Sequence, residues 1–204
     1  MRNQNVTFTL VASTNGSPLH YEWQFNVTNL NGVQANQLSN QRICLTAFNR
    51  QIINGHEQRY DMSCIPSSLE MVLKLLGREP ESYYDLQDAW KNKSDGTFGD
   101  FEIKTIKGVT FHRQFGMPRG GQFPLSDLFA TIDRELKAGR YVIVSLTSNP
   151  GWHMYVIYYE DGDGDVLAVS KIRKETIAAD HVKKIIKGMN GTDIMTYELG
   201  AESD

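Results

Sequence analysis

A cysteine stands at the start of an apolar-striped segment in EQRYDMSCIPSSLEMVLKLLG. Pro66 follows Cys64 by two residues and fits the first turn of a helix, where its missing N–H is not needed. Leucine and valine then recur at the spacing of one helical face, until Gly77 ends the pattern. The N–H groups and the dipole at a helix N-terminus favour the thiolate, which is the reactive form of cysteine. Cys64 is therefore a candidate nucleophile.

Cysteine catalysis also needs a general base and a donor for the oxyanion. Among the five histidines, His153 alone follows a Pro-Gly-Trp turn and begins a continuous apolar run, MYVIYY. A histidine at the mouth of a buried strand can be held rigidly and still face a cleft. Gln58 lies six residues before Cys64, across enough chain to bring its amide back beside the sulfur. Taken singly, these two residues read as a core histidine and a solvated glutamine, but with Cys64 they make a candidate catalytic set.

Other motifs give no sign of a cofactor or a metal. Cys44 lies in the alternating segment RICLTAF, where nothing nearby would ionise a thiol, so we expect an inert core residue. The sequence contains neither CxxC nor HExxH. The segment DGDGD, residues 161–165, spaces its aspartates like a calcium loop, but Val166 and Ile172 stand where that loop needs Gly and Glu. We expect an acidic hairpin turn there, and no cofactor.

Composition narrows the choice of partners. The chain of 204 residues is 40% hydrophobic and 22% charged, with a net charge of −3, as in ordinary globular proteins. That balance argues against a dedicated binder of nucleic acid or of anionic membranes. The N-terminus lacks an apolar signal region, and no run reaches the ~18 apolar residues of a membrane span. The expected location is cytoplasmic, with delivery by a non-Sec secretion route left open.

Periodicity predicts an α+β protein with a β-rich N-terminal extension, residues 1–55, and the candidate catalytic residues all lie in the expected domain that follows, residues 56–204. Apolar stripes predict helices, and β-branched or alternating runs predict strands. The expected helices span residues 67–77, 81–93, 124–136 and 175–191. The expected strands span residues 5–13, 19–27, 42–48, 108–116, 139–147, 152–160, 166–172 and 193–199.

Two long segments resemble papain-like cysteine peptidases, most closely the bacterial C39-like (double-glycine-type) group. They are CIPSSLEMVLKLLG and LFATIDRELKAGRYVIVSLTSNPGWHMYVIYYEDGDGDVLAVS, and the resemblance covers roughly residues 56–172. Phytochelatin synthases show a similar pattern more weakly. The resemblance implies a papain-like fold, in which a helix with the Cys at its N-terminus packs on an antiparallel sheet that carries the His. It implies that Cys64 is the nucleophile, His153 the general base and acid, and Gln58 an oxyanion donor beside the backbone N–H of Cys64.

This sequence departs from the C39-like pattern at the residue that should orient the histidine. The group has an aspartate at the end of the return strand, where this chain reads VSK. A two-residue turn at 161–162 would pair Glu160 with Asp163 and set Ser170 opposite His153, so that the hydroxyl accepts the Nδ1 proton. Ser170 is thus the candidate third triad member, and Asp165 is its rival if the register slips. The residues flanking the Cys also differ, since Ser63 and Ile65 replace the usual Asp and Gly.

The resemblance implies a thiol protease or amidohydrolase that acts on a protein or peptide. An acyl-thioester on Cys64 would serve hydrolysis of a peptide, isopeptide or side-chain amide bond. A glutamine deamidase or an acyl or peptidyl transferase would use the same residues. The serine in place of the aspartate leaves a third alternative open, a peptide-binding pseudoenzyme that lost turnover. Specificity is expected in loops 92–100 and 117–124 and in the extension.

Overall fold

The computed structural model describes residues 7–13, 20–26, 47–93, 96–148, 151–160 and 164–200. The chain divides into two compact units, residues 1–39 and 40–204. In the first unit, β1 (Thr7–Ser13) pairs antiparallel with β2 (His20–Asn26), close to two expected strands. The division falls before the expected boundary at residue 55, because the helix α1 (Ala47–Gly55) lies in the second unit and packs on α2.

The second unit is a mixture of helices and one antiparallel sheet, so the predicted α+β class is confirmed. In its described residues, seven strands pair in the order β3-β4-β9-β5-β6-β7-β8. The strands are β3 (Thr105–Ile106), β4 (Val109–Arg113), β5 (Val142–Ser148), β6 (Gly151–Glu160), β7 (Val166–Ile172), β8 (Glu175–Ala179) and β9 (Ile194–Leu199). The remaining helices are α2 (Cys64–Leu75), α3 (Asp85–Asp88), the 3-10 helix η1 (Phe98–Phe101), α4 (Leu125–Lys137) and α5 (Val182–Gly188).

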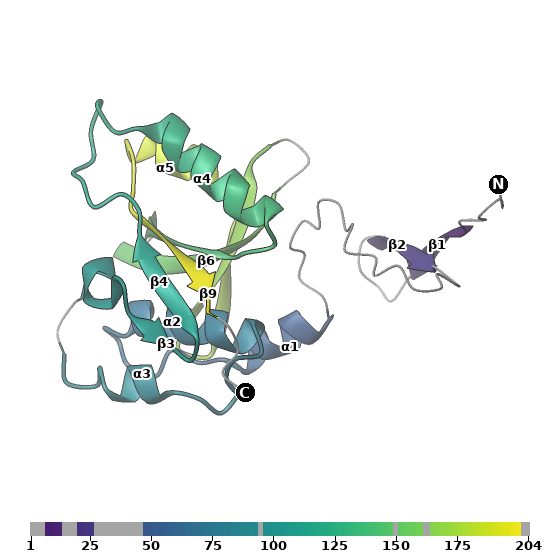
Figure 1. Cartoon of the computed structure of the whole chain (residues 1–204), viewed down its shortest axis with the longest axis horizontal. Helices are drawn as coiled ribbons and strands as arrows, with labels where there is room; N and C mark the ends of the chain where they lie inside the picture. The colour runs from purple at the N-terminus through teal and green to yellow at the C-terminus, as the bar shows by residue number, and fades with distance from the viewer. Residues whose placement is uncertain are drawn as a thin grey trace. The chain divides into compact units, whose positions relative to one another are not determined.

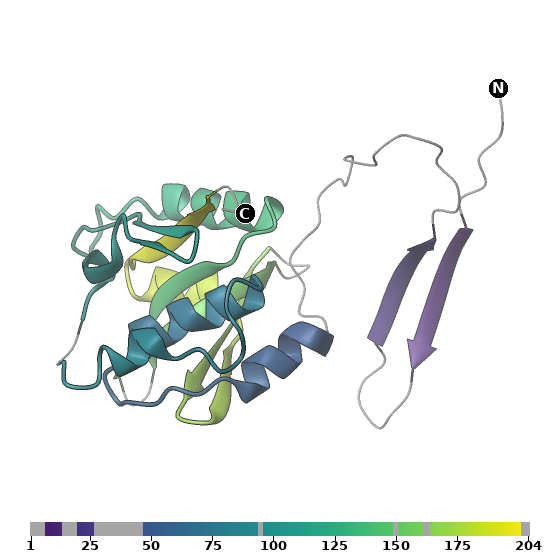
Figure 2. The same cartoon turned by 60° about the horizontal axis from the view of Figure 1, so that its bottom comes forward.

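Helices cover both faces of the sheet, with α2 on one face and α4 and α5 on the other (Figure 1). The turned view in Figure 2 shows strands between the blue helix α2 and the green helix α4. Along β6, Met154 and Val156 join the core beneath α2, whereas Tyr155 and Ile157 join the core beneath α4 and α5. A strand buried on both faces is apolar without alternation, which explains the continuous run in this segment.

The expected helix over residues 175–191 is half strand. Glu175–Ala179 forms β8, the edge strand beside β7, and α5 begins only at Val182. His181 sits between them in the left-handed region, with φ of 53°, and this breaks any continuous helix. Ile177 and Ala179 both contact the core beneath α5. Their spacing of two residues fits one face of a strand, whereas residues two apart lie on nearly opposite sides of a helix.

The hairpin between β6 and β7 has a different register from the predicted one. Glu160 pairs with Val166 instead of Asp163, and the ladder shifts between Ile157 and Tyr159. The intervening loop is therefore longer than two residues, and residues 161–163 themselves lie outside the described part. The helices of the described residues include none long and apolar enough to cross a membrane.

Candidate active site

Cys64 is the first residue of α2, where its sequence context predicts it. Ser63 occupies the N-cap position, but its side chain makes no capping bond. The Ser63 hydroxyl lies instead 2.7 Å from the carbonyl oxygen of Tyr60 and 2.8 Å from Oε1 of Gln87. Cys64 is half-buried and in no disulfide, and it stands at the positive end of the helix dipole. This location favours a thiolate.

His153 lies near the start of β6 with a defined ring tautomer. Its Nε2 is 3.0 Å from the carbonyl oxygen of Lys171 and 2.9 Å from Oγ of Ser170. A carbonyl oxygen can only accept, so Nε2 carries the proton of the neutral ring and Nδ1 holds the lone pair. Burial lowers the pKa of His153 below its ordinary value, and the bond to Lys171 opposes that shift. The ring is therefore held in the form that can take up a proton at Nδ1.

The hydroxyl of Ser170 contacts His153, but at a different ring nitrogen from the predicted one. Ser170 is buried and donates its own proton to the carbonyl oxygen of Met154, so it accepts from Nε2–H of the ring. The prediction of a bond to Nδ1 was wrong, and the register that set Ser170 directly opposite His153 does not occur either. Val156 pairs with Val169, and Ser170 approaches the ring just beyond that pair.

Gln58 is buried in the turn that leads into Cys64. Its Nε2 donates to the carbonyl oxygens of Tyr60 and Asp61, both at 3.0 Å, and its backbone N–H donates to the carbonyl oxygen of Arg173 at 2.9 Å. Rotating the amide would set Oε1 against two carbonyl oxygens, so this orientation is the favourable one. Oε1 is buried with no hydrogen-bond partner in the described part of the chain. Donation to an oxyanion would require the release of Tyr60 or Asp61.

Cys64 and His153 line the same cavity, which has a volume of about 520 Å³. Its remaining walls include the apolar side chains of Met62, Ile65, Phe98, Trp152 and Met154 and the charged side chains of Asp61, Arg113, Arg119 and Asp193. A second cavity of about 310 Å³ contains Gln58 and also reaches His153. The structure therefore brings Cys64 and His153 to one cavity, and Gln58 and His153 to another.

The two side chains of the candidate pair belong to different layers of the fold. Cys64 contacts the core beneath α2. The ring of His153 packs edge-on against Tyr155, with centroids 5.6 Å apart, and Tyr155 belongs to the core beneath α4 and α5. The beginning of β6, where His153 follows the exposed Trp152, is the place at which both layers contribute to the cavity.

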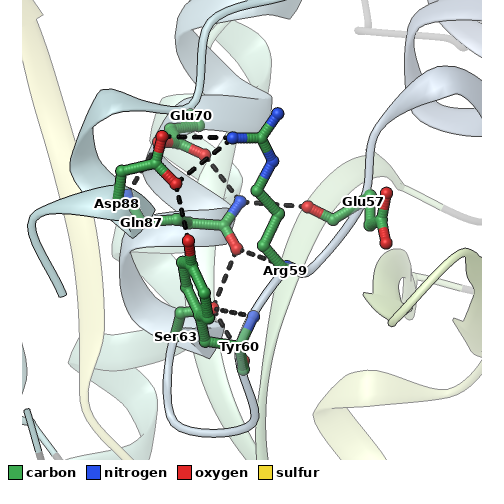
Figure 3. A network of polar contacts seen from close by, with 7 residues as sticks. All are labelled: Glu57, Arg59, Tyr60, Ser63, Glu70, Gln87 and Asp88. Atoms are coloured by element: carbon green, nitrogen blue, oxygen red, sulfur yellow. Dashed lines mark hydrogen bonds and ion pairs between the residues drawn. The ribbon is translucent and has the colours of Figure 1, made fainter. Parts of the chain in front are cut away.

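A buried network that the sequence did not indicate fixes the segment ahead of Cys64 (Figure 3). Its centre is Gln87 of α3, which is fully buried and donates from N and Nε2 to the carboxylate of Glu70 at 2.9 Å and 2.6 Å. Oε1 of Gln87 accepts from the backbone N–H of Arg59 and from Ser63, both at 2.8 Å. Burial raises the pKa of Glu70 to about 7, against the bonds from Gln87. Nothing in the polar segment around Gln87 distinguishes it from a solvated glutamine.

A second buried pair lies along the same side of α2. Nδ1 of His56 accepts from Nζ of Lys74 at 3.0 Å, so Nε2–H donates to the carbonyl oxygen of Ser67 at 2.9 Å. Nζ of Lys74 also lies 3.6 Å from the centre of the Tyr84 ring. Burial and the neighbouring charge of Lys74 lower the pKa of His56 to about 3. His56 follows α1 in a loop, as the sequence indicates, but its side chain is part of the core.

Asp165, the last residue of the acidic segment between β6 and β7, has a structural role. The carboxylate of Asp165 accepts the backbone N–H groups of Val166 and Lys183, both at 2.7 Å, and of Lys184 at 3.3 Å. Asp165 therefore caps the start of α5. It is not the residue that orients His153, whose ring contacts Ser170 and Lys171. Within the described ranges, no group of three or more His, Cys, Asp or Glu side chains is placed to hold a metal ion. Cys44 lies outside the described residues.

Comparison with known proteins identifies no relative of the chain. No protein-family model matches it, and neither a curated protein nor a solved structure is significantly similar to it. Membership of the papain-like peptidases therefore stays a prediction from the motifs around Cys64 and His153.

Proposed function

We propose that this protein is a cysteine-dependent hydrolase of papain-like arrangement that cleaves an amide bond in a peptide or protein. The observation that carries the proposal is the shared cavity. It holds Cys64, at the start of a helix that favours its thiolate, and His153, whose ring has its lone pair on Nδ1. Nucleophile and base are the two groups that the reaction requires.

The proposed reaction proceeds through an acyl-thioester. Nδ1 of His153 takes the thiol proton of Cys64, and Sγ forms a bond to the carbonyl carbon of the substrate. The carbon–nitrogen bond then breaks, and the amine leaves with the proton from Nδ1. Water gives a proton to the same Nδ1 and attacks the thioester, so that the carbon–sulfur bond breaks and the thiol is restored. The backbone N–H of Cys64 is the proposed oxyanion donor, with Gln58 as a second donor once one of its carbonyl bonds is released.

Neutral groups orient the proposed base. Ser170 and the carbonyl oxygen of Lys171 both accept from Nε2–H and hold the ring in place. Neither carries the charge with which an aspartate stabilises an imidazolium. We therefore expect slower turnover than in a triad with a carboxylate. The same thioester can also pass to an amine or thiol acceptor, or form from a glutamine side chain, so transfer and deamidation belong to the same proposal.

A second candidate function is peptide binding without turnover. Two observations favour it: His153 has no carboxylate partner at Nε2 in the described residues, and both donor positions of the Gln58 amide are engaged by carbonyl oxygens. In that case the cavity would retain a peptide, and Cys64 would be a reactive but unproductive thiol.

Incubation with a complex peptide library separates the two candidates. The wild type should create new peptide termini, detected by mass spectrometry, or release ammonia from glutamine peptides. Cys64→Ala and His153→Ala should abolish this, and Cys44→Ala should retain it. Hydroxylamine should trap the acyl group from the wild type as a hydroxamate. If the wild type retains peptides without forming products, the result would support peptide binding without turnover. Activity that survives in Cys64→Ala would contradict the proposed cysteine-dependent hydrolase.

A further inference from the structure

We infer that Arg119 and Trp152 form a carboxylate-binding subsite in the Cys64 cavity, so that the preferred ligand is a peptide with an acidic group near the bond under attack. Attack on a bond rests on the proposed hydrolase function, whereas the binding of a carboxylate does not. The subsite follows from the charges that line the cavity and from which of them are already neutralised.

Most charged side chains of the cavity have a partner of opposite sign. Nε of Arg113 donates to Oδ2 of Asp193. Asp61 accepts from a guanidinium nitrogen of Arg173 at 2.6 Å. Arg119 differs, because no carboxylate in the described part of the chain forms an ion pair with it. The lining holds two aspartates and two arginines, but Asp61 is paired with Arg173 outside the lining, and Arg119 is left without a carboxylate partner among the described residues.

The Asp193 carboxylate is not available to form an ion pair with Arg119. Its Oδ1 accepts the backbone N–H groups of Phe115 and Ile194, at 2.8 Å and 2.9 Å, while Oδ2 binds Arg113. If this carboxylate turned to a neighbouring arginine, it would lose these three hydrogen bonds, so its present conformation is the favourable one. Arg119 is exposed, so its guanidinium is accessible to a carboxylate that a ligand brings.

Stacking presents the guanidinium of Arg119 in a useful orientation. Its central carbon lies 3.4 Å from the ring centre of Trp152. Because a guanidinium stacked on an aromatic face keeps its N–H donors at its edge, it can bind a carboxylate with two parallel bonds. Trp152 precedes His153 in β6, and 45% of its surface is exposed. The subsite is therefore built on the strand that carries the proposed base.

The chemistry favours a carboxylate over a phosphate. A phosphate dianion is generally held by more than one cation or by a set of backbone N–H donors. Arg113, the other arginine of the cavity lining, already forms an ion pair with Asp193. One planar guanidinium with exposed apolar neighbours such as Met62 matches a single carboxylate on an otherwise uncharged peptide. The carboxylate can belong to a glutamate or aspartate side chain or to a peptide C-terminus.

Binding can be measured without turnover in the full-length Cys64→Ala variant. The probes are N-acetylglutamic acid amide, N-acetylalanine as a free acid, and the neutral N-acetylglutamine amide. The readouts are the NMR signals of the Arg119 Nε–H and Trp152 indole N–H groups. We expect at least one acid to bind about tenfold or more tightly than the neutral probe, the usual effect of a charge-assisted hydrogen bond. The two acids distinguish a side-chain carboxylate from a terminal one.

Matched variants connect that preference to Arg119. Adding Arg119→Gln should abolish the preference for the acids over the neutral probe, as read from the Trp152 indole signal. Arg134→Gln, which alters an exposed arginine of α4 outside the cavity lining, should leave that preference unchanged. Equal binding of all three probes, or an acid preference that survives Arg119→Gln, would overturn the subsite.

Cleavage distinguishes failure of the subsite from failure of the proposed function. With the peptide library, the wild type should favour an acidic residue or terminus at one fixed position from the cleaved bond, and Arg119→Glu should favour a basic residue there. Cleavage with no such preference, together with equal probe binding, would reject the subsite and leave the hydrolase standing. Acid-selective probe binding without any cleavage would reject the hydrolase and leave the subsite standing.

Discussion

Ser170 Oγ lies 2.9 Å from Nε2 of His153 and gives its own proton to the carbonyl oxygen of Met154. This direction of bonding makes the serine an acceptor for the imidazole. With the Lys171 carbonyl oxygen as a second acceptor, it fixes the Nε2–H tautomer of the neutral ring. A hydroxyl at this position can orient the ring, but it supplies no negative charge to an imidazolium.

Substitution of Ser170 should separate orientation from charge. Ser170→Ala should keep the Nε2–H tautomer, because Lys171 still accepts, and should lower turnover only a few-fold. Ser170→Asp should raise the pKa of His153, because a nearby carboxylate favours the imidazolium. The tautomer and the pKa are both measured from the ¹⁵N shifts of the ring in a pH titration. A neutral His153 protonated at Nδ1 in the wild type would contradict the assignment.

Selective alkylation tests the environment of Cys64. At mildly acidic pH, iodoacetamide should modify Cys64 well before Cys44, because a helix N-terminus lowers a thiol pKa from its ordinary value of about 8.5. Peptide mapping by mass spectrometry gives the two rates from one sample. His153→Ala should slow the reaction at Cys64 and leave that at Cys44 unchanged. Equal rates at the two cysteines would remove the basis for a nucleophile at residue 64.

The location of Cys64 could be predicted from the sequence because its signals are local. Pro66 and the apolar stripe that ends at Gly77 lie within one helix length, and α2 begins at Cys64. The run after His153 likewise predicts a buried strand, which is β6. Propensity and periodicity act over such distances, so element type follows from them.

Features that depend on pairing between distant segments could not be predicted in this way. The ladder shift between Ile157 and Tyr159 sets the position of Ser170, and no residue type marks it. Gln87 is buried only because Glu70, Ser63 and the backbone of Arg59 surround it in three dimensions. In the sequence, a glutamine in a polar segment has the same appearance whether it is exposed or central to a network.

Gln58 should contribute to stability as well as to turnover. Gln58→Ala removes the Nε2 donor that bonds the carbonyl oxygens of Tyr60 and Asp61, and since each such bond contributes about 0.5–1.5 kcal/mol, the free energy of unfolding should fall measurably. If Gln58 also donates to an oxyanion, kcat should fall by about 10²–10³. Urea unfolding and steady-state kinetics measure the two effects separately. An unchanged free energy of unfolding would mean that the two carbonyl bonds are not significant in solution.

Gln87 should be among the polar residues that matter most for folding. Gln87→Leu would leave the carboxylate of Glu70 without its two donors and Arg59 N–H without its acceptor. Leaving a buried group without its hydrogen-bond partner costs about 1–3 kcal/mol, and more for a charged group. Asp88→Asn is the matched control on α3, since its exposed pair with Arg59 should contribute less than about 1 kcal/mol. Similar losses for the two variants in urea unfolding would argue against the network.

Because His56 is buried, we expect the free energy of unfolding to depend on pH in the acid range. Between pH 6.5 and pH 3 the unfolded chain binds a proton at this residue, whereas the folded chain, with a pKa of about 3, does not. The folded state should therefore lose about 1.4 kcal/mol of stability at this site for each pH unit of acidification in that window. His56→Gln removes this titration and can still donate to the Ser67 carbonyl oxygen and accept from Lys74.

The variant should therefore gain stability relative to the wild type as the pH falls from 6.5 towards 3. Glu70, whose pKa is raised to about 7, changes stability in the opposite direction, since its contribution is lost as the pH rises from 4.5 through 7. It is present in both proteins, so the difference between their free energies of unfolding isolates His56. Lys74, with a pKa of about 8, titrates above the window. Urea unfolding at half-unit pH steps gives the two curves, and the exposed His181→Gln should follow the wild type. Parallel curves for wild type and His56→Gln would show that His56 takes up its proton equally in the folded and unfolded states, and would contradict the bond from Lys74.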